Sequence, residues 1–481
     1  MEKTTRDATS DFSFRDPAGH FWMEKGRAFR WVLSDHAPDI LQFLSQAKVK
    51  QWIASKKLVA SRPLELSEVL ESFSPHTREK IQSSSGILLE HECIEFPSYP
   101  YEWSPAMLHA AAGLTLELAE ESLTLGYQLK DATPYNVLFD GPLPCWVDLL
   151  SFEKRNPLDG TWRAYGQFVR TFLLPLLANK HLGMSLQEIY LPQRDGLDSH
   201  SLYKKIGFFK KWRSPFLSLL TLPNLLEKSS NSSSTQAYKS KLFSSAEQAQ
   251  FVLKSLFKHL RRLLKKLKPI SLESNWTQYA VCGHCSEQYE QVKAAWVKKC
   301  LARNPLQKVL DIGCNLGHYS EMFTQQGAQV VSIDLDSAVI DKLWRKSALQ
   351  KLKILPLLQN LAWPSPGLGW ANQENRSFLD RASGHFDGIL MYAVIHHLLI
   401  TAQIPLPQIV ELISKLNPAC LIIEYVDPQD EMFKTLLRGR EDLYAFFNPT
   451  YFENCFSKYF EMVEKQNLDF IPRTLYYMKR K

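Results

Sequence analysis

Long apolar runs are missing from this 481-residue chain. No apolar segment reaches the length of about 18 residues that a helix needs to cross a bilayer, so the sequence predicts no transmembrane segment. Residues 1–7 also lack the apolar stretch of a secretory signal peptide. We therefore expect a protein of the reducing cytoplasm.

Cysteines are few, and the eight that occur are scattered, which does not favour a disulfide framework. Only Cys282 and Cys285 have the spacing of a metal or redox motif. A zinc site needs a second pair of ligands nearby, and the sequence has none. A thioredoxin-like motif needs a strand before it and a helix after it within a small βαβ unit, which this segment does not match. We expect no function for this pair.

Acidic residues are scarce between positions 201 and 270. This segment has twelve Lys and three Arg against two Glu, a net charge of +13, whereas the whole chain carries +7. Within it, residues 228–247 are rich in Ser, Asn, Gln and Thr, which predicts a flexible insert. A capping box of Ser244 and Glu247 is expected to begin the helix that follows.

Apolar residues recur at helical spacing from Val252 to Leu267, and basic residues mostly line the opposite face. We favour an ordinary packing helix with a solvated basic side. The alternative is that the basic 201–270 segment contacts an anionic partner, which would be nucleic acid, acidic lipid or a charged substrate. No aromatic platform for stacking bases is interleaved with these charges, so we do not expect sequence-specific recognition of nucleic acid.

The most informative stretch is residues 309–320, with the sequence VLDIGCNLGHYS. An apolar strand runs to Asp311, and a turn containing Gly313 and Gly317 leads into a helix. Glycine has no Cβ, so such a turn lets the backbone approach a ligand closely. The dinucleotide-binding pattern would need a third glycine near residues 318–320. Its absence argues against a pyrophosphate cradle.

A second predicted strand, residues 329–334, ends in Asp334. An acid at that position can accept hydrogen bonds from both hydroxyls of a ribose. Together with Asp311, it suits a ligand that has an ammonium group, a ribose and an adenine but no phosphate. S-adenosylmethionine (SAM) has this chemistry.

Residues 305–425 resemble the class I SAM-dependent methyltransferases, whose first motif has the form hydrophobic-Asp-x-Gly-x-Gly-x-Gly. Residues 310–317 match this form with one departure, because Asn315 stands where glycine is usual. Asparagine tolerates left-handed backbone better than most residues, so we expect the turn to persist. The resemblance implies that Asp311 and Gly313 bind the methionine part of SAM and that Asn315 and Gly317 belong to the same cofactor-binding turn.

The same resemblance assigns roles further along the chain. It implies that Asp334 binds the ribose and that Asn360, where an aspartate is common, accepts from the adenine amino group. His396 lies in a His-His-Leu sequence after the fourth strand and is the candidate general base. Asp336 is expected to cap the helix after Asp334, and Asp387 is expected to be structural.

A second constellation lies in residues 128–153. Asp131 is followed by Asn136 and then by Asp148, with a hairpin-like turn between the last two. Protein kinases use this arrangement: the first Asp orients the acceptor hydroxyl, and the Asn and the second Asp bind magnesium. The alternative is that these residues cap turns of a different α/β domain.

The kinase resemblance has clear departures. No His-Arg precedes Asp131, leucines follow Asp148 in place of Phe-Gly, and no Gly-rich phosphate loop is visible. We therefore expect a degenerate kinase-like domain, in which Asp131 would be catalytic and Asn136 and Asp148 would hold magnesium only if Mg-ATP binds.

The combination of the two halves resembles bacterial nodulation-type methyltransferases, and residues 96–103 and 130–136 carry the N-terminal part of that resemblance. We predict an α/β protein with a Rossmann-like, seven-stranded methyltransferase domain at residues 275–481, preceded by an α+β kinase-like domain at residues 14–270. The predicted function is methyl transfer from SAM to a small-molecule, glycan or protein acceptor. The alternative is phosphotransfer by the N-terminal domain, alone or in a bifunctional enzyme.

Overall fold

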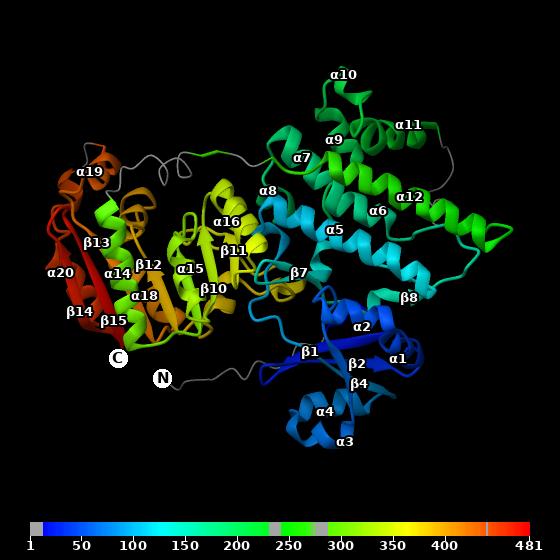
Figure 1. Cartoon of the computed structure of the whole chain (residues 1–481), viewed down its shortest axis with the longest axis horizontal. Coiled ribbons are helices and arrows are strands. Elements are labelled where there is room, and N and C mark those ends of the chain that lie inside the picture. Colours follow the sequence, from blue (N-terminus) through cyan, green and yellow to red (C-terminus); the bar gives the residue numbers. More distant parts are fainter. Residues whose placement is uncertain (1–12, 230–241, 271–272, 275–286, 439–440) are drawn as a thin grey trace.

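The computed structural model describes residues 13–229, 242–270, 273–274, 287–438 and 441–481. Most of the predicted insert at residues 228–247 lies outside this part of the chain, as do Cys282 and Cys285. No helix among the described residues has the length and apolarity needed to cross a membrane. The chain forms two regions, an N-terminal half of mixed structure and a C-terminal half built around one large sheet (Figure 1).

A four-stranded antiparallel sheet begins the N-terminal half, with the strand order β1-β2-β4-β3. Lys25 and Gly26 form the tight turn between β1 and β2, and both have positive φ, as a two-residue hairpin turn requires. The strands are β1 (Gly19–Glu24), β2 (Arg27–Leu33), β3 (Ser61–Leu64) and β4 (Gly86–His91). The helices between them are α1 (Ala37–Ser45), α2 (Ala47–Ala54), α3 (Leu66–Val69) and α4 (Pro75–Gln82).

The rest of the N-terminal half is mainly helical and surrounds the long, buried helix α5 (Pro105–Ser122). Two short antiparallel pairs follow α5: β5 (Tyr127–Leu129) with β8 (Phe152–Lys154), and β6 (Val137–Asp140) with β7 (Leu143–Trp146). The remaining helices are α6 (Tyr165–Phe168), α7 (Leu174–Leu182), α8 (Leu186–Tyr190), α9 (Ser199–Lys205), α10 (Phe208–Lys211), α11 (Leu222–Ser229) and α12 (Ala246–Lys266).

Helix α12 confirms the prediction of a packing helix. Most of its leucines and Phe257 are buried, and it lies along α5. The predicted cap is wrong by one residue: Ser245, not Ser244, caps the helix, and its side chain accepts a hydrogen bond from Gln248 N. Ser244 instead places its hydroxyl 2.8 Å from Gln248 Oε1.

The C-terminal half contains a seven-stranded sheet with the order β11-β10-β9-β12-β13-β15-β14. The first five strands are parallel, and β15 and the edge strand β14 complete the sheet with antiparallel pairing, which confirms the predicted architecture. The strands are β9 (Lys308–Ile312), β10 (Gln329–Asp334), β11 (Ile354–Leu358), β12 (Gly388–Met391), β13 (Cys420–Val426), β14 (Phe460–Leu468) and β15 (Arg473–Arg480).

Helices cover both faces of this sheet (Figure 1). Successive strand residues point to opposite faces, so Val309 packs with α14 and α15 while Leu310 packs with α18 and α20. The helices are α14 (Glu287–Arg303), α15 (His318–Gln325), α16 (Ser337–Gln350), α17 (Phe378–Ala382), α18 (Leu406–Leu416), α19 (Glu431–Leu437) and α20 (Pro449–Ser457). As predicted, Asp336 caps α16 and Asp387 is structural, because it accepts from backbone amides at the start of β9.

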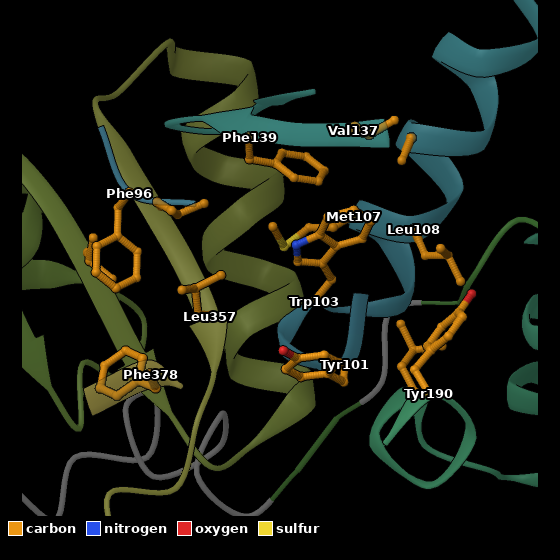
Figure 2. Close-up of a cluster of buried hydrophobic side chains, with 14 of the residues drawn as sticks. Phe96, Tyr101, Trp103, Met107, Leu108, Val137, Phe139, Tyr190, Leu357 and Phe378 are labelled. Carbon is orange, nitrogen blue, oxygen red and sulfur yellow. The ribbon is translucent and has the colours of Figure 1, made fainter. Parts of the chain in front are cut away.

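The two halves share a continuous apolar core. Trp103 and Met107 of the N-terminal half lie in the same buried cluster as Leu357, and Phe96 packs edge-on against Phe378 (Figure 2). Polar contacts border this core. Asp341 of α16 accepts hydrogen bonds from Ser104 Oγ at 3.1 Å and from Ala106 N at 3.2 Å, at the start of α5.

A buried ion pair joins the halves beside this core. Arg381 of α17 contacts Glu102, which has no solvent exposure, and its guanidinium also lies over the rings of Phe96 and Tyr99. Ser365 Oγ donates a further hydrogen bond to Glu102 Oε1 at 2.5 Å. The interface therefore contains buried polar contacts with specific partners as well as apolar packing.

Candidate functional site

The turn after β9 has the backbone that a close ligand contact needs. Gly313, Asn315 and Gly317 have φ of +71°, +47° and +77°, which confirms that Asn315 takes left-handed backbone. A Cβ on Gly313 would lie 2.3 Å from Val394 Cγ2, so no larger residue fits there. The amides of Gly313 and Cys314 donate to Ile333 O, which fixes the turn against the end of β10.

Asp334 lies directly beside this turn. Its Oδ2 accepts from Asn315 N at 3.1 Å and its Oδ1 accepts from Asp336 N at 3.0 Å. Burial raises the pKa of this carboxyl, and these backbone donors oppose the rise. Each carboxylate oxygen has a second lone pair, so two acceptors remain for hydroxyl groups of a ligand.

Asp311 is almost completely buried under the turn. It accepts a hydrogen bond from Ser320 Oγ, which also contacts Ser332 Oγ at 2.8 Å. Burial raises the pKa of Asp311 to about 7, and the nearby Asp334 contributes to the rise. A cationic ligand would favour the ionised form, because an opposite charge lowers a carboxyl pKa.

The end of β11 carries Asn360, the residue predicted to contact the adenine. Asn360 is exposed, and its Oδ1 accepts a hydrogen bond from Ala362 N at 2.9 Å. The preceding Gln359 is buried and contacts Ser365 Oγ at 3.1 Å. The contact of Asn360 with an adenine stays a prediction.

His396 and His397 follow β12 and stack on each other, with ring centroids 4.3 Å apart. His396 is 2% exposed, and burial lowers its pKa well below the usual range. Its Nδ1 has no hydrogen-bond partner among the described residues. The preceding Ala393 has φ of +52°, an uncommon conformation for this residue that marks a constrained bend at the strand end. The role of His396 as a base stays a prediction.

A cage of tyrosines surrounds a lysine that was not predicted from the sequence. Lys293 of α14 is buried, and its Nζ lies 4.5 Å, 5.1 Å and 4.8 Å from the ring centroids of Tyr289, Tyr319 and Tyr392. Glu424 of β13 has no solvent exposure, and its Oε2 is 3.8 Å from Lys293 Nζ. The aromatic faces and the carboxylate together favour a positive charge at this point.

The charge network extends to strand β15. Arg473, at the start of β15, donates to Asp430 Oδ2 at 2.8 Å and lies 3.5 Å from Glu424 Oε1. Tyr289 Oη accepts a hydrogen bond from Arg473 Nη1 at 2.6 Å. This network attaches α14 to the sheet at the end where β12 and β13 finish, beside the turn of Asp311.

In the N-terminal half, Asp131, predicted to be catalytic, and Asp148, predicted to bind magnesium, lie in a different environment. Asp131 follows β5, and Asp148 follows β7. Burial raises the pKa of both carboxyls, and each of them is close enough to other acids for repulsion to contribute. Arg30 of β2 is buried, and its Nη1 is 3.2 Å from Asp148 Oδ1. Among the described residues, no group of His, Cys, Asp and Glu has the geometry of a metal site.

The fold and the turn at residues 311–317 define a SAM-dependent methyltransferase, and residues 285–464 match a family model described as a methyltransferase domain. Over 476 residues, the chain is 30% identical to the nodulation protein NoeA of Rhizobium meliloti (strain 1021), with 97% of this chain and 95% of that protein covered. The chain belongs to the NoeA family, which confirms the resemblance found from the sequence.

Solved structures give weaker similarities. The N-methyltransferase NodS from Bradyrhizobium japonicum WM9 is 13% identical, with 40% of this chain and 98% of NodS covered and a TM-score of 0.30. The bifunctional kinase-methyltransferase WbdD is 17% identical, with 40% of this chain and 39% of WbdD covered and a TM-score of 0.29. These scores are too low to carry an argument about either half.

The residues at the turn fit SAM. Asn315 Oδ1 is a buried acceptor with no hydrogen-bond partner among the described residues, which suits an ammonium group. The backbone of Gly313 is exposed beside this acceptor, and Asp334 retains acceptor capacity for a ribose. SAM, when bound, supplies an electrophilic methyl group on its sulfonium sulfur.

Proposed function

We propose that this chain transfers the methyl group of SAM to an acceptor that enters at the carboxyl ends of β12 and β13. The cofactor-binding residues in this proposal are Asp311, Gly313, Asn315, Gly317, Asp334 and Asn360. The main support is the left-handed turn in which Asn315 N donates a hydrogen bond to Asp334. This turn brings exposed backbone and a carboxylate that can accept hydrogen bonds close together. In open α/β sheets, ligands bind at the carboxyl ends of the strands.

The protein's own contribution is mainly placement, because holding two reactants in line lowers the barrier to transfer. Asp334 would bind the ribose hydroxyls, and Asn315 and Asp311 would attract the ammonium end. His396 would accept the acceptor's proton, since burial keeps its imidazole neutral.

The acceptor itself is a small molecule, a glycan or a protein group in this proposal. Calorimetry with SAM tests the cofactor site in the full-length protein. Asp334→Ala and Asp311→Ala should each abolish or strongly weaken binding, whereas Asp336→Ala removes a carboxylate two residues away that only caps α16 and should leave affinity unchanged. SAM affinity unaffected by the first two substitutions would contradict the proposal. Labelled methyl groups then identify the acceptor by the product.

The second candidate is phosphotransfer by a kinase-like domain at residues 14–270. Its support is local topology: β5 pairs with β8 and β6 with β7, which brings Asp131 and Asp148 within electrostatic reach of each other. Against it, the Arg30 guanidinium already neutralises Asp148, the carboxylate that would bind magnesium. We therefore propose a kinase-like scaffold without phosphotransfer. Mg-ATP binding that is lost in Asp148→Ala would favour the phosphotransferase instead.

A further inference from the structure

Aromatic and basic side chains gather on an exposed tip of the N-terminal half, which we call the basic-aromatic tip and define as residues 204–213. Phe208, Phe209 and Trp212 are 69%, 84% and 56% exposed. They lie next to basic residues, so exposed aromatic side chains do occur among the charges of the 201–270 segment. The basic residues of the tip are Lys204, Lys205, Lys210, Lys211 and Arg213.

Positive charge at this tip is not balanced by acids. No Asp or Glu occurs between positions 199 and 226. Among the described residues, none of the tip's five basic side chains forms an ion pair. Lys211 instead places its Nζ 3.8 Å from the ring centroid of Tyr203. The tip therefore presents a net positive charge to its surroundings.

The position of the tip leaves it accessible. Figure 1 shows α10 at the outer end of the helical region, with α9 and α11 beside it and the seven-stranded sheet on the other side of the molecule. Thr221 Oγ1 donates to Lys211 O at 2.6 Å, which attaches the end of α10 to the helices beneath it. The exposed rings are thus held on an ordered support.

The basic helix α12 differs from the tip. Its large apolar side chains mostly pack onto α5, and Arg261 on its basic side pairs with Glu120. At the tip, three exposed aromatic rings lie among five basic side chains that form no ion pair with the described residues, whereas α12 exposes the single phenyl ring of Phe251. Large apolar groups on a protein surface mark a contact site when they cluster.

We propose that the basic-aromatic tip docks on the surface of an anionic lipid bilayer. Trp and Phe side chains gain free energy at the level of the lipid headgroups, and lysines next to them attract acidic lipids. The neighbouring helix α11 adds the exposed aliphatic side chains of Leu222 and Leu225, which are 48% and 45% exposed. Aliphatic side chains insert among acyl chains but do not stack on bases, which favours lipid over nucleic acid.

Flotation of the full-length protein with vesicles tests this proposal. Vesicles of phosphatidylcholine alone are compared with vesicles that also contain phosphatidylglycerol, at low and high salt. Binding should require the acidic lipid and weaken with salt. Removing two charges in Lys210→Gln/Lys211→Gln should weaken it by about fivefold per lysine. Phe208→Ser/Phe209→Ser should weaken binding at both salt concentrations, because it removes the apolar contribution.

Two matched controls distinguish an effect of the basic-aromatic tip from an effect of net charge or of any exposed ring. Lys254→Gln/Lys258→Gln removes the same charge from exposed positions on α12 and should have a much smaller effect. Trp370→Ser removes a ring that is 71% exposed in the C-terminal half and should have none. Circular dichroism verifies that each variant is folded.

Three outcomes would overturn the proposal: no flotation with acidic vesicles, equal losses from the α12 control and the tip variants, or retention of flotation in Phe208→Ser/Phe209→Ser. Binding to a single-stranded RNA oligonucleotide, lost in the same tip variants and not matched by vesicle binding, would assign the tip to nucleic acid instead.

Discussion

Removing Arg381 should destabilise the whole chain, because Glu102 would lose its counter-charge at a position without solvent exposure. Breaking a buried ion pair from one side costs about 3–5 kcal/mol. Arg381→Leu keeps apolar contact with Phe96 and Tyr99 but removes the guanidinium that lies 5.0 Å and 4.8 Å from their ring centroids. We expect a loss near the upper end of that range.

The partner substitution tests the electrostatic reason. In Glu102→Gln/Arg381→Leu the side-chain oxygen can still accept from Ser365 Oγ, but no buried charge remains. Most of the lost stability should therefore return. Urea unfolding followed by far-ultraviolet circular dichroism gives the free energy of unfolding of the single and the double variant. Lys415→Met, which breaks an exposed pair with Glu411, is the control and should leave the midpoint unchanged. A loss in Arg381→Leu that the double variant does not reverse would refute this reasoning.

Three further changes test the cofactor site. Gly317→Ala should lower the free energy of unfolding by about 3 kcal/mol in a thermal unfolding experiment, because the φ of Gly317 is +77° and a Cβ would lie 2.3 Å from Leu343 Cδ1. Gly384→Ala is the control: its φ is +70° but the space around it is open, so the loss should be about 1 kcal/mol. In the folded protein Asp311 keeps its proton up to a pH of about 7, whereas in the unfolded chain its pKa is the ordinary 3.8. Between these two pH values the unfolded state loses the proton first. The stability of the ligand-free protein should therefore fall as the pH rises from 3.8 to about 7 and then level off. Urea unfolding at a series of pH values should show this slope, and Asp311→Asn should remove it. In Lys293→Met the pH at which stability levels off should be higher, because the Lys293 ammonium lowers the pKa of Asp311. An unchanged pH would contradict this effect of Lys293 on Asp311.

Local sequence was enough for the sheet and the turn. The bounds of β10 match the predicted residues 329–334, because an apolar run that ends at an acid specifies a buried parallel strand. The conformation of Asn315 was also predictable, since only a few residue types tolerate left-handed backbone. Both are properties of a few neighbouring residues.

The charged network was not predictable, because it joins residues far apart in the chain. Lys293 lies on a helix, Glu424 on a strand 131 positions later, and Arg473 on the antiparallel strand β15. One signal was present: Glu424 interrupts the apolar sequence of β13, and all seven residues of that strand are buried. An acid within a buried strand requires a partner, although the sequence does not say which cation supplies it.

Contacts from the N-terminal half reach the strand end where the proposed cofactor site would receive adenine. Gln187 of α8 donates to Leu358 O at 3.3 Å, at the last residue of β11. Gln359 contacts Ser365, and Ser365 donates to Glu102, so the segment after β11 is bound to the N-terminal half through a second path. Separating the two halves would expose the Glu102 carboxylate. It would also remove the contacts that hold the segment after β11 in place. The N-terminal half is therefore part of the framework that positions the cofactor end of the sheet, whatever else it binds.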